Sequence, residues 1–307
     1  LKIEACGVCH SQLHGIEGDW LDIGIPPALP TVPGHEVVGK IIGIGKDVTK
    51  FKVGDRAGIT PLLEACQKCQ YCLEGKEYLC ESSIITGESF KGGYTEYITV
   101  TENFATKVPE SMKAEYAAPL FCAGITAYKA VKAAEPKQDK KIGIFGIGGV
   151  GHMAVQFAKV ENCDVIAFSR TQSHLDVAKR LGANDAMKFT ENQDEFLSTL
   201  KEKHGTLDAA IVFAPADIVT DTAIKSVKKG GLIVIATVGE NPAFSAFEEK
   251  TIRGTLIGST KDMEQVIKIC DEKNIEVITQ TFPLENANEV LKKLKDSEIE
   301  ARGVLIP

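Results

Sequence analysis

The chain has 307 residues, of which 44% are hydrophobic and 25% are charged, and its formal net charge is −7. This length allows two domains with separate hydrophobic cores. No apolar run approaches the roughly 20 residues that a membrane-spanning helix needs, so we expect no membrane segment. The acidic balance offers no basic surface, which argues against nucleic acid or an anionic membrane as a partner.

The first part of the chain, to about residue 120, is predicted to be mostly β. Residues 1–5 already have the pattern of a strand, so we expect the natural N-terminus to lie upstream. Further β-like runs cover 37–42 and 94–100, and the turn formers Pro33-Gly34 and Gly92-Gly93 separate them.

Four cysteines interrupt this part with the spacing C-x2-C-x2-C-x7-C; they are Cys66, Cys69, Cys72 and Cys80. This spacing is typical of a tetrahedral zinc site made of four thiolates. Disulfides, or cysteines used as small apolar residues, are the alternatives; the odd total of nine cysteines argues against a disulfide framework. Four protein ligands leave no position for a substrate, so this zinc is expected to be structural.

From about residue 123 the pattern changes to strands that alternate with helices. We expect strands at 141–145, 164–168, 209–213 and 232–236, and helices at 150–160 and 173–181. Gly182 is placed to end the second helix. Repeated β-α-β units predict an α/β domain with a doubly wound parallel sheet. After Ser259 we expect two helical stretches and a final strand at 304–306.

A glycine-rich turn follows the strand at 141–145 and opens the helix after it. It reads G-x-G-x-x-G, and its predicted cofactor-binding residues are Gly146, Gly148, Gly149, Val150 and Gly151. The glycines allow a tight turn, close approach of a pyrophosphate and close packing of helix on strand. The amides of the helix N-terminus then face the phosphates. The sequence therefore predicts a dinucleotide site.

The end of the next strand indicates which dinucleotide binds. A carboxylate there usually binds the adenosine ribose of NAD, but this chain has Ser169 and Arg170. A hydroxyl beside a guanidinium suits a 2′-phosphate, although Arg170 is also compatible with a solvated surface cation. We therefore expect NADP(H) to be preferred over NAD(H).

A second metal site is suggested by scattered residues. Cys9, His35 and Cys122 together form a donor set of two thiolates and one imidazole, which would leave a fourth zinc position open. Spacing alone does not decide this, because a lone cysteine such as Cys122 in an apolar stretch is more often a core residue.

Several motifs in order along the chain resemble the zinc-dependent medium-chain alcohol dehydrogenases, closest to the NADP-type, cinnamyl-alcohol-like and bacterial enzymes. Besides the four-cysteine segment and the glycine turn, they are Ala5-Cys6-Gly7-Val8-Cys9-His10-Ser11, Glu17-Gly18-Asp19-Trp20, Pro33-Gly34-His35-Glu36, Val53-Gly54-Asp55-Arg56 and the segment 120–128. The resemblance implies a GroES-like, mostly β catalytic domain at 1–122 and 259–307 with a zinc lobe at about 64–82. It implies a Rossmann domain at 123–258.

The resemblance also implies roles for single residues. Cys9, His35 and Cys122 match the ligands of the catalytic zinc. The remaining matches are Glu36 as a carboxylate near the metal, Ser11 as the hydroxyl that takes the alcohol proton, His14 as the outer end of the proton relay, Trp20 as a wall of the substrate pocket, and His10 and Arg302 as basic groups over the cofactor pyrophosphate.

One residue departs from the family pattern near this zinc. Gln12 stands where the family usually has an aspartate that orients the ligating histidine. An amide can accept the same hydrogen bond but adds no charge, so zinc affinity or reactivity is expected to differ.

Together these features predict an enzyme with two zinc ions per chain that transfers hydride reversibly between a primary alcohol, or its aldehyde, and NADP(H). An NAD-dependent enzyme for short-chain alcohols is the nearer alternative, because Glu17-Gly18-Asp19-Trp20 also occurs there. A nucleotide-binding protein without catalysis is a further alternative, but the metal ligands argue against it. We expect a cytoplasmic homodimer or homotetramer.

Overall fold

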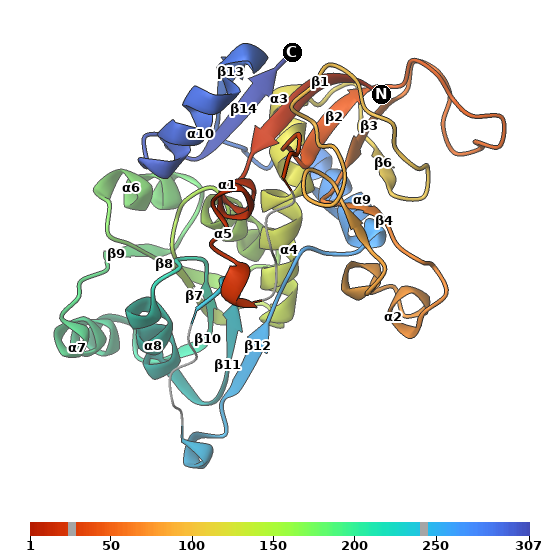
Figure 1. The fold of residues 1–307 in the computed structure, drawn as a ribbon. Helices are drawn as coiled ribbons and strands as arrows, with labels where there is room; N and C mark the ends of the chain where they lie inside the picture. Colours follow the sequence, from red (N-terminus) through yellow and green to blue (C-terminus); the bar gives the residue numbers. More distant parts are fainter. Residues whose placement is uncertain (24–28, 240–244) are drawn as a thin grey trace. The chain divides into compact units, whose positions relative to one another are not determined.

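Two sheets of six strands organise the described residues of this computed structural model, which are 1–23, 29–239 and 245–307 (Figure 1). The chain divides into two compact units. The first unit comprises residues 1–125 and 257–307, and the second comprises residues 126–256.

The first unit contains the mixed sheet, with strand order β13-β14-β1-β2-β3-β6. Its strands pair antiparallel except β13 and β14, which run parallel. The strands are β1 (Lys2–Val8), β2 (Glu36–Lys40), β3 (Arg56–Ile59), β6 (Ala105–Lys107), β13 (Thr279–Pro283) and β14 (Arg302–Ile306). Strands from both ends of the chain thus complete one sheet.

Short helices and a small lobe surround this sheet. The lobe contains the two-stranded pair β4 (Leu62–Glu64) and β5 (Ile84–Ile85), together with α2 (Gln70–Leu73) and η2 (Glu77–Leu79). The other helical elements of this unit are α1 (His10–Glu17), η1 (Leu21–Ile23), α3 (Ala114–Ala117), η3 (Ala118–Phe121), α9 (Thr260–Lys273), η5 (Leu284–Asn286) and α10 (Ala287–Lys295). Apolar side chains of α10, among them Val290 and Leu294, pack on Val8 and Leu305.

The strand predicted at 94–100 is wrong. This segment forms only an isolated bridge between Tyr97 and Lys2. Ile98 donates to the carbonyl of Leu1 and Glu96 accepts from the amide of Ile3, so the segment pairs locally with the start of the chain. Tyr94 donates instead to the carbonyl of Pro33, so the pairing does not extend along the whole predicted strand.

The second unit contains the parallel sheet, with strand order β12-β11-β10-β7-β8-β9. All neighbouring strands run parallel, which confirms the predicted α/β sheet. The strands are β7 (Lys141–Phe145), β8 (Asp164–Ser169), β9 (Asp185–Lys188), β10 (Leu207–Val212), β11 (Val227–Ile235) and β12 (Thr251–Gly254). The helical elements are α5 (Gly151–Val160), α6 (Gln172–Arg180), α7 (Gln193–His204), α8 (Asp217–Ser226) and η4 (Ala246–Glu248); α4 (Ala123–Ala133) begins in the first unit and continues into this one.

Helices cover this sheet and exclude water from it. Helices α5 and α6 pack on β7, β8 and β9, whereas α8 packs on β10 and β11 and contacts α7. Phe145, Phe168 and Phe196 form a buried aromatic cluster at the centre, with Phe145 and Phe168 stacked at 4.4 Å between ring centroids. Burying such rings stabilises the unit through their large apolar area.

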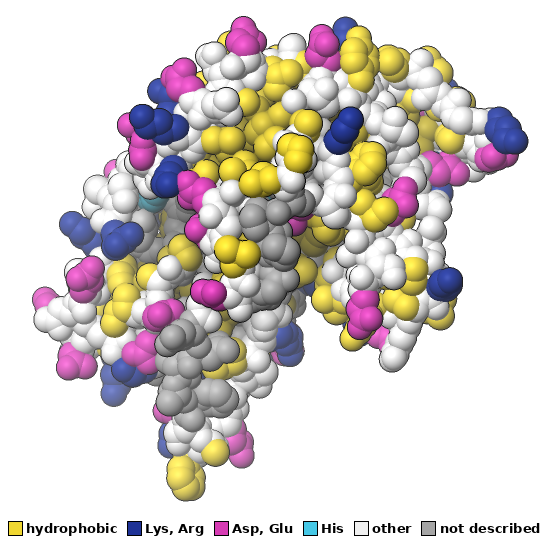
Figure 2. Space-filling model, in the orientation of Figure 1, with side chains coloured by type: hydrophobic (Ala, Val, Ile, Leu, Met, Phe, Trp, Pro, Cys, Tyr) yellow, Lys and Arg dark blue, Asp and Glu magenta, His cyan; other side chains and the backbone are white. Residues whose placement is uncertain are grey.

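The surface carries charges of both signs. Figure 2 shows acidic and basic side chains interspersed over the visible face rather than gathered by sign. Within the described part of the chain, no helix combines the length and the apolar character that crossing a bilayer requires.

Candidate functional site

Among the described residues, two clusters of side chains that could hold a metal ion lie in the first unit. In each cluster, one ligand atom from every member lies within 4.8 Å of the others. The first cluster consists of Cys66, Cys69, Cys72 and Cys80, and the second of Cys9, His35, Glu36 and Cys122.

The four-cysteine cluster sits in the small lobe and fits a closed zinc site. The sulfurs of Cys66 and Cys72 are 4.0 Å apart, close to the roughly 3.8 Å that tetrahedral zinc–thiolate geometry requires. The backbone amide of Cys69 donates to Cys66 Sγ at 3.3 Å. Backbone amides of Lys68 and Cys69 lower the pKa of Cys66 to about 6, which favours the thiolate that a metal binds. All nine cysteines are free thiols, so the disulfide alternative is not adopted.

The second cluster is assembled from three distant segments. Cys9 precedes α1, His35 precedes β2, and Cys122 lies between η3 and α4. The sulfurs of Cys9 and Cys122 are 3.8 Å apart, a separation that again matches two thiolates on one tetrahedral zinc. The hydrogen bond from Cys122 holds the pKa of Cys9 well below its usual range, since together with His35 it outweighs burial. Two thiolates and an imidazole therefore converge on a point that can hold zinc with one position open.

Ser11 and Glu36 flank this cluster. Ser11 Oγ lies 3.2 Å from Cys9 Sγ and 3.4 Å from His35 Nε2, so the hydroxyl adjoins the point where the ligands converge. Glu36 is fully buried and accepts a hydrogen bond from the guanidinium of Arg302. Burial raises the pKa of Glu36 to about 7, while Arg302 acts in the opposite direction.

The remaining predicted residues of this unit lie on or just after α1, except Arg302, which begins β14. His14 Nδ1 lies 2.7 Å from Asp19 Oδ2, and the His14 ring lies 5.7 Å from that of Trp20. His10 is exposed and its ring is 6.1 Å from that of His14. Arg302, expected over the cofactor pyrophosphate, is almost fully buried and pairs with Glu36.

The glycine turn in the second unit has the geometry that its sequence predicts. Gly146 has a φ of +99°, and a Cβ there would approach Ala214 N to 2.9 Å. A Cβ on Gly151 would lie 1.9 Å from the carbonyl oxygen of Gly146, so helix and turn pack without room for a side chain. Around Gly148 nothing lies within 4 Å of such a Cβ, which leaves the backbone open to a phosphate.

His152 supports this turn, a role that the sequence did not indicate. Its imidazole is buried, and Nδ1 lies 2.9 Å from the carbonyl oxygen of Gly148. The ring thus holds the middle of the turn against the first turn of α5. A histidine inside a helix gives no such signal in sequence, because only the folded turn brings a carbonyl to it.

The end of β8 is polar. Ser169 is buried, and its Oγ lies 3.4 Å from His174 Nδ1 and accepts a hydrogen bond from the amide of Thr171. Arg170 is exposed beside it. No carboxylate stands in the segment 168–171.

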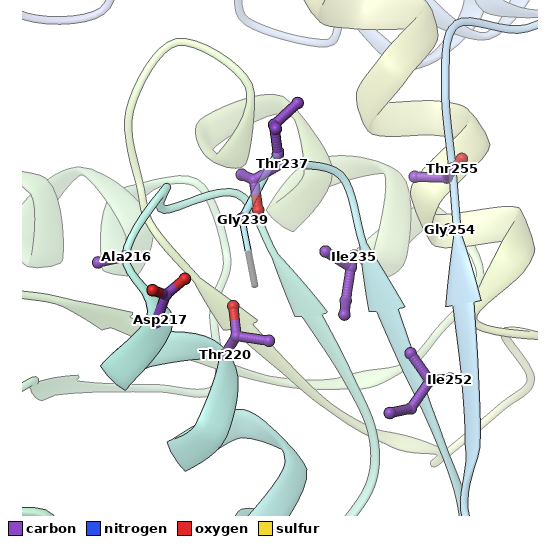
Figure 3. Close-up of a pocket in the computed structure, with 10 residues that line it drawn as sticks. Ala216, Asp217, Thr220, Ile235, Thr237, Gly239, Ile252, Gly254 and Thr255 are labelled. Carbon is purple, nitrogen blue, oxygen red and sulfur yellow. The ribbon is translucent and has the colours of Figure 1, made fainter. Parts of the chain in front are cut away.

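A hollow of about 450 Å³ opens at the same edge of the parallel sheet (Figure 3). Ile235 ends β11, Gly254 ends β12, and Asp217 and Thr220 belong to the first turn of α8. Figure 3 shows these residues around the hollow, with Thr237 and Thr255 following the two strands. Ligands of open α/β sheets bind at the carboxyl ends of the strands, so this hollow is a candidate for part of the dinucleotide site. Its residues carry no sequence motif, so nothing in the sequence indicated them.

Comparison with known proteins identifies the family of the chain. Residues 1–110 match the family model described as alcohol dehydrogenase GroES-like domain, and residues 149–272 match that described as zinc-binding dehydrogenase. An alcohol dehydrogenase of Geobacillus stearothermophilus is 39% identical over 310 residues, which cover 99% of this chain and 90% of that protein.

Solved structures share the fold. The alcohol dehydrogenase of the hyperthermophilic archaeon Aeropyrum pernix superposes with a TM-score of 0.91 at 29% identity, covering 100% of this chain and 91% of that one. A cinnamyl alcohol dehydrogenase of Sorghum bicolor gives a TM-score of 0.87 at 30% identity, covering 99% and 88%. These matches confirm the expected fold, a GroES-like domain with a Rossmann-like parallel sheet. Identity of this extent over nearly the whole chain reflects common descent, and the chain therefore belongs to the zinc-containing medium-chain alcohol dehydrogenases.

Proposed function

We propose that this alcohol dehydrogenase interconverts primary alcohols and aldehydes with NADP(H) as its preferred cofactor, and that Cys9, His35 and Cys122 hold its catalytic zinc. The observation that supports the zinc assignment is the convergence of the two thiolates, 3.8 Å apart, with the imidazole of His35. A metal at this point would act as a Lewis acid, polarising a carbonyl and lowering the pKa of an alcohol.

The position of Ser11 supports a role in moving the substrate proton. Its hydroxyl lies beside the metal ligands, and a hydroxyl can accept a proton from an alcohol while it donates its own onward. His14 lies one turn further along α1, where it is half-buried and pairs with Asp19. We assign Ser11 to the proton transfer and His14 to the outer end of the relay. Trp20, whose ring lies against His14, is assigned to the substrate pocket.

We assign Glu36 to a position from which it can approach the metal, and Arg302 to compensation of its charge. The carboxylate belongs to the ligand cluster, and its other oxygen has no hydrogen-bond partner among the described residues. A buried carboxylate with a free oxygen can approach a metal when another ligand leaves. Arg302 limits the cost of burying this charge.

The preference for NADP(H) is supported by the polar end of β8. Ser169, Arg170 and His174 offer a hydroxyl, a guanidinium and an imidazole there, and no carboxylate repels a 2′-phosphate. The dinucleotide would extend from this point across the turn at 146–151 toward the hollow at the ends of β11 and β12. The order of the strands, β8, β7, β10 and β11, arranges these three places along one edge.

The experiment is a comparison of initial rates with NADPH and NADH against aliphatic and aromatic aldehydes. We expect NADPH to give the higher kcat/KM, and Arg170→Gln to raise KM for NADPH without raising that for NADH. Lys201→Gln, which removes an exposed cation elsewhere in the same unit, is the matched control. Equal or better use of NADH by the parent enzyme would instead support the short-chain, NAD-dependent alternative.

A second experiment tests the proton path. Ser11→Ala is expected to lower kcat by about 10²-fold or more, the range for loss of a positioned proton-transfer group, whereas Ser11→Thr retains a hydroxyl. Retention of zinc by both variants separates proton transfer from metal binding.

Assembly and location remain part of the proposal. We propose a homodimer or homotetramer, to be measured by light scattering of the purified protein. Nine free thiols suit a reducing compartment, and we propose the cytoplasm.

A further inference from the structure

The zinc-ligand candidate His35 has a buried ring nitrogen without a partner. Only 2% of His35 is exposed, and its Nδ1 has no hydrogen-bond acceptor among the described residues. A metal-binding histidine usually donates this second N–H to a carboxylate or carbonyl, which fixes the ring and raises the basicity of the ligand. A neighbouring side chain that accepts this N–H, or places negative charge beside the ring, would therefore strengthen zinc binding by His35.

Gln12 is one candidate, because it contacts the residue next to His35, but its side chain is engaged elsewhere. Its Oε1 accepts a hydrogen bond from the backbone amide of Gly34, next to His35. Its Nε2 lies 3.4 Å from Oε1 of Glu88 and can donate to it. The amide itself is neutral, so it supplies position but no charge.

Glu88 is held at this place by the chain around it. Gly87, with a φ of +76°, packs so closely on Gln12 that a Cβ would lie 2.3 Å from its Oε1. The hydroxyl of Thr31 donates to the carbonyl of Gly87 at 3.4 Å. Glu88 is half-buried, and burial raises its pKa, whereas the imidazole of His35 acts in the opposite direction. Gln12 thus links this carboxylate to Gly34, the residue next to His35, although Glu88 is not part of the ligand cluster.

We propose that Glu88, held by Gln12, supplies the negative charge that supports His35 as a zinc ligand. The charges of the cluster explain why this matters. Two thiolates neutralise the charge of one zinc ion, and Arg302 neutralises Glu36. Glu88 lies outside this balance and forms no ion pair among the described residues, so it adds negative charge beside the site from a segment 76 residues away from Gln12. Glu88 does not bind the metal itself. It acts through its contact with Gln12 and through the negative charge of its carboxylate, so it is a positioning residue.

This inference rests on the proposed zinc site, and the test measures the metal rather than turnover. Zinc release from the full-length protein into an excess of chelator is followed with a chromogenic indicator. The variant His35→Ala is measured first. The release phase that it loses or accelerates is assigned to the catalytic site. If this variant releases zinc as the parent does, the proposed site fails, whatever Glu88 does.

Glu88→Gln then removes the charge and preserves the shape. We expect release in the phase assigned by His35→Ala to become about 10-fold to 100-fold faster, the usual effect of losing a partner of a metal ligand. Release from the four-cysteine site is expected to stay unchanged. Glu96→Gln, at an exposed carboxylate outside both ligand clusters, is the matched control and is expected to behave as the parent.

Rescue separates a charge effect from a structural one. In the Glu88→Gln protein, the further change Gln12→Asp returns a carboxylate to the neighbourhood of His35, and release is expected to slow toward the parent rate. The proposal is overturned if Glu88→Gln matches Glu96→Gln, if both release phases accelerate alike, or if Gln12→Asp brings no recovery.

Discussion

The carboxylate of Glu36 accepts a hydrogen bond from the guanidinium of Arg302, 266 residues further along the chain. Glu36 is the first residue of β2 and Arg302 the first of β14, so the bond joins two strands that both flank β1. Glu36 is fully buried and Arg302 is 5% exposed, so each charge depends on the other for compensation. Gly7 of β1 makes room for the pair, since a Cβ there would lie 1.8 Å from Glu36 Oε2.

Removal of one partner is therefore expected to destabilise the first unit. Arg302→Met leaves the carboxylate buried without compensation, and we expect it to lower the free energy of unfolding by about 3–5 kcal/mol. Chemical denaturation followed by fluorescence measures this. The double variant Glu36→Gln with Arg302→Met removes both charges and is expected to recover part of the loss. A double variant as unstable as Arg302→Met alone would show that the loss comes from packing rather than charge.

Two alanine substitutions in the glycine turn are expected to affect different properties, one the stability of the protein and the other cofactor binding. Gly151→Ala places a Cβ against the carbonyl of Gly146, so we expect it to lower the melting temperature. Gly148→Ala meets no atom within 4 Å in the protein, so we expect stability to be retained. The added methyl instead occupies the open space above the turn and is expected to raise KM for the cofactor. Thermal melts and cofactor titrations of both variants check this; unchanged cofactor binding by Gly148→Ala would place the phosphates elsewhere.

The small lobe depends on its metal in our interpretation. Its hydrophobic cluster is small, and the four cysteines themselves contribute to it. Cys72→Ser is expected to lower the zinc content by one ion per chain and to make the segment around 66–80 sensitive to proteolysis. Cys270→Ala, at a buried thiol outside both clusters, is the control and is expected to keep its zinc. Full zinc content in Cys72→Ser would contradict this assignment.

The sequence predicted those features whose chemistry is local. The spacing of Cys66, Cys69 and Cys72 and the turn at 146–151 each fit within a few residues, so their geometry follows from ligand number and from glycine φ angles. The contact between Gln12 and Glu88 joins residues 76 positions apart and leaves no periodic signal. The predicted strand at 94–100 failed for a related reason, because β propensity does not reveal where the amides of a segment find acceptors. The hollow at the ends of β11 and β12 was missed since sheet order, not sequence order, assembles it.

Asp185 links pH to the stability of the second unit. Lys179 Nζ lies 2.6 Å from Oδ1 and His204 Nε2 lies 2.8 Å from Oδ2. Burial opposes ionisation, but Lys179, the amide of Ala186 and His204 outweigh it and lower the pKa of Asp185 to about 2. Because the folded pKa is below the ordinary value of 3.8, the stabilisation is fully present above that value and is lost as pH falls toward about 2.

Asp185→Asn is therefore expected to lower the melting temperature at pH 7, by roughly 3–6 °C for a loss of about 1–2 kcal/mol after allowance for solvent screening. The difference between parent and variant is expected to narrow when melts are repeated at pH 4 and pH 3, since acid protonates the parent carboxylate in the unfolded chain first. Glu202→Gln, at an exposed carboxylate of α7 near His204, is the control and is expected to show no such narrowing. A difference for Asp185→Asn that stays constant with pH would mean that the side chain acts by its shape and hydrogen bonds, and not by its charge.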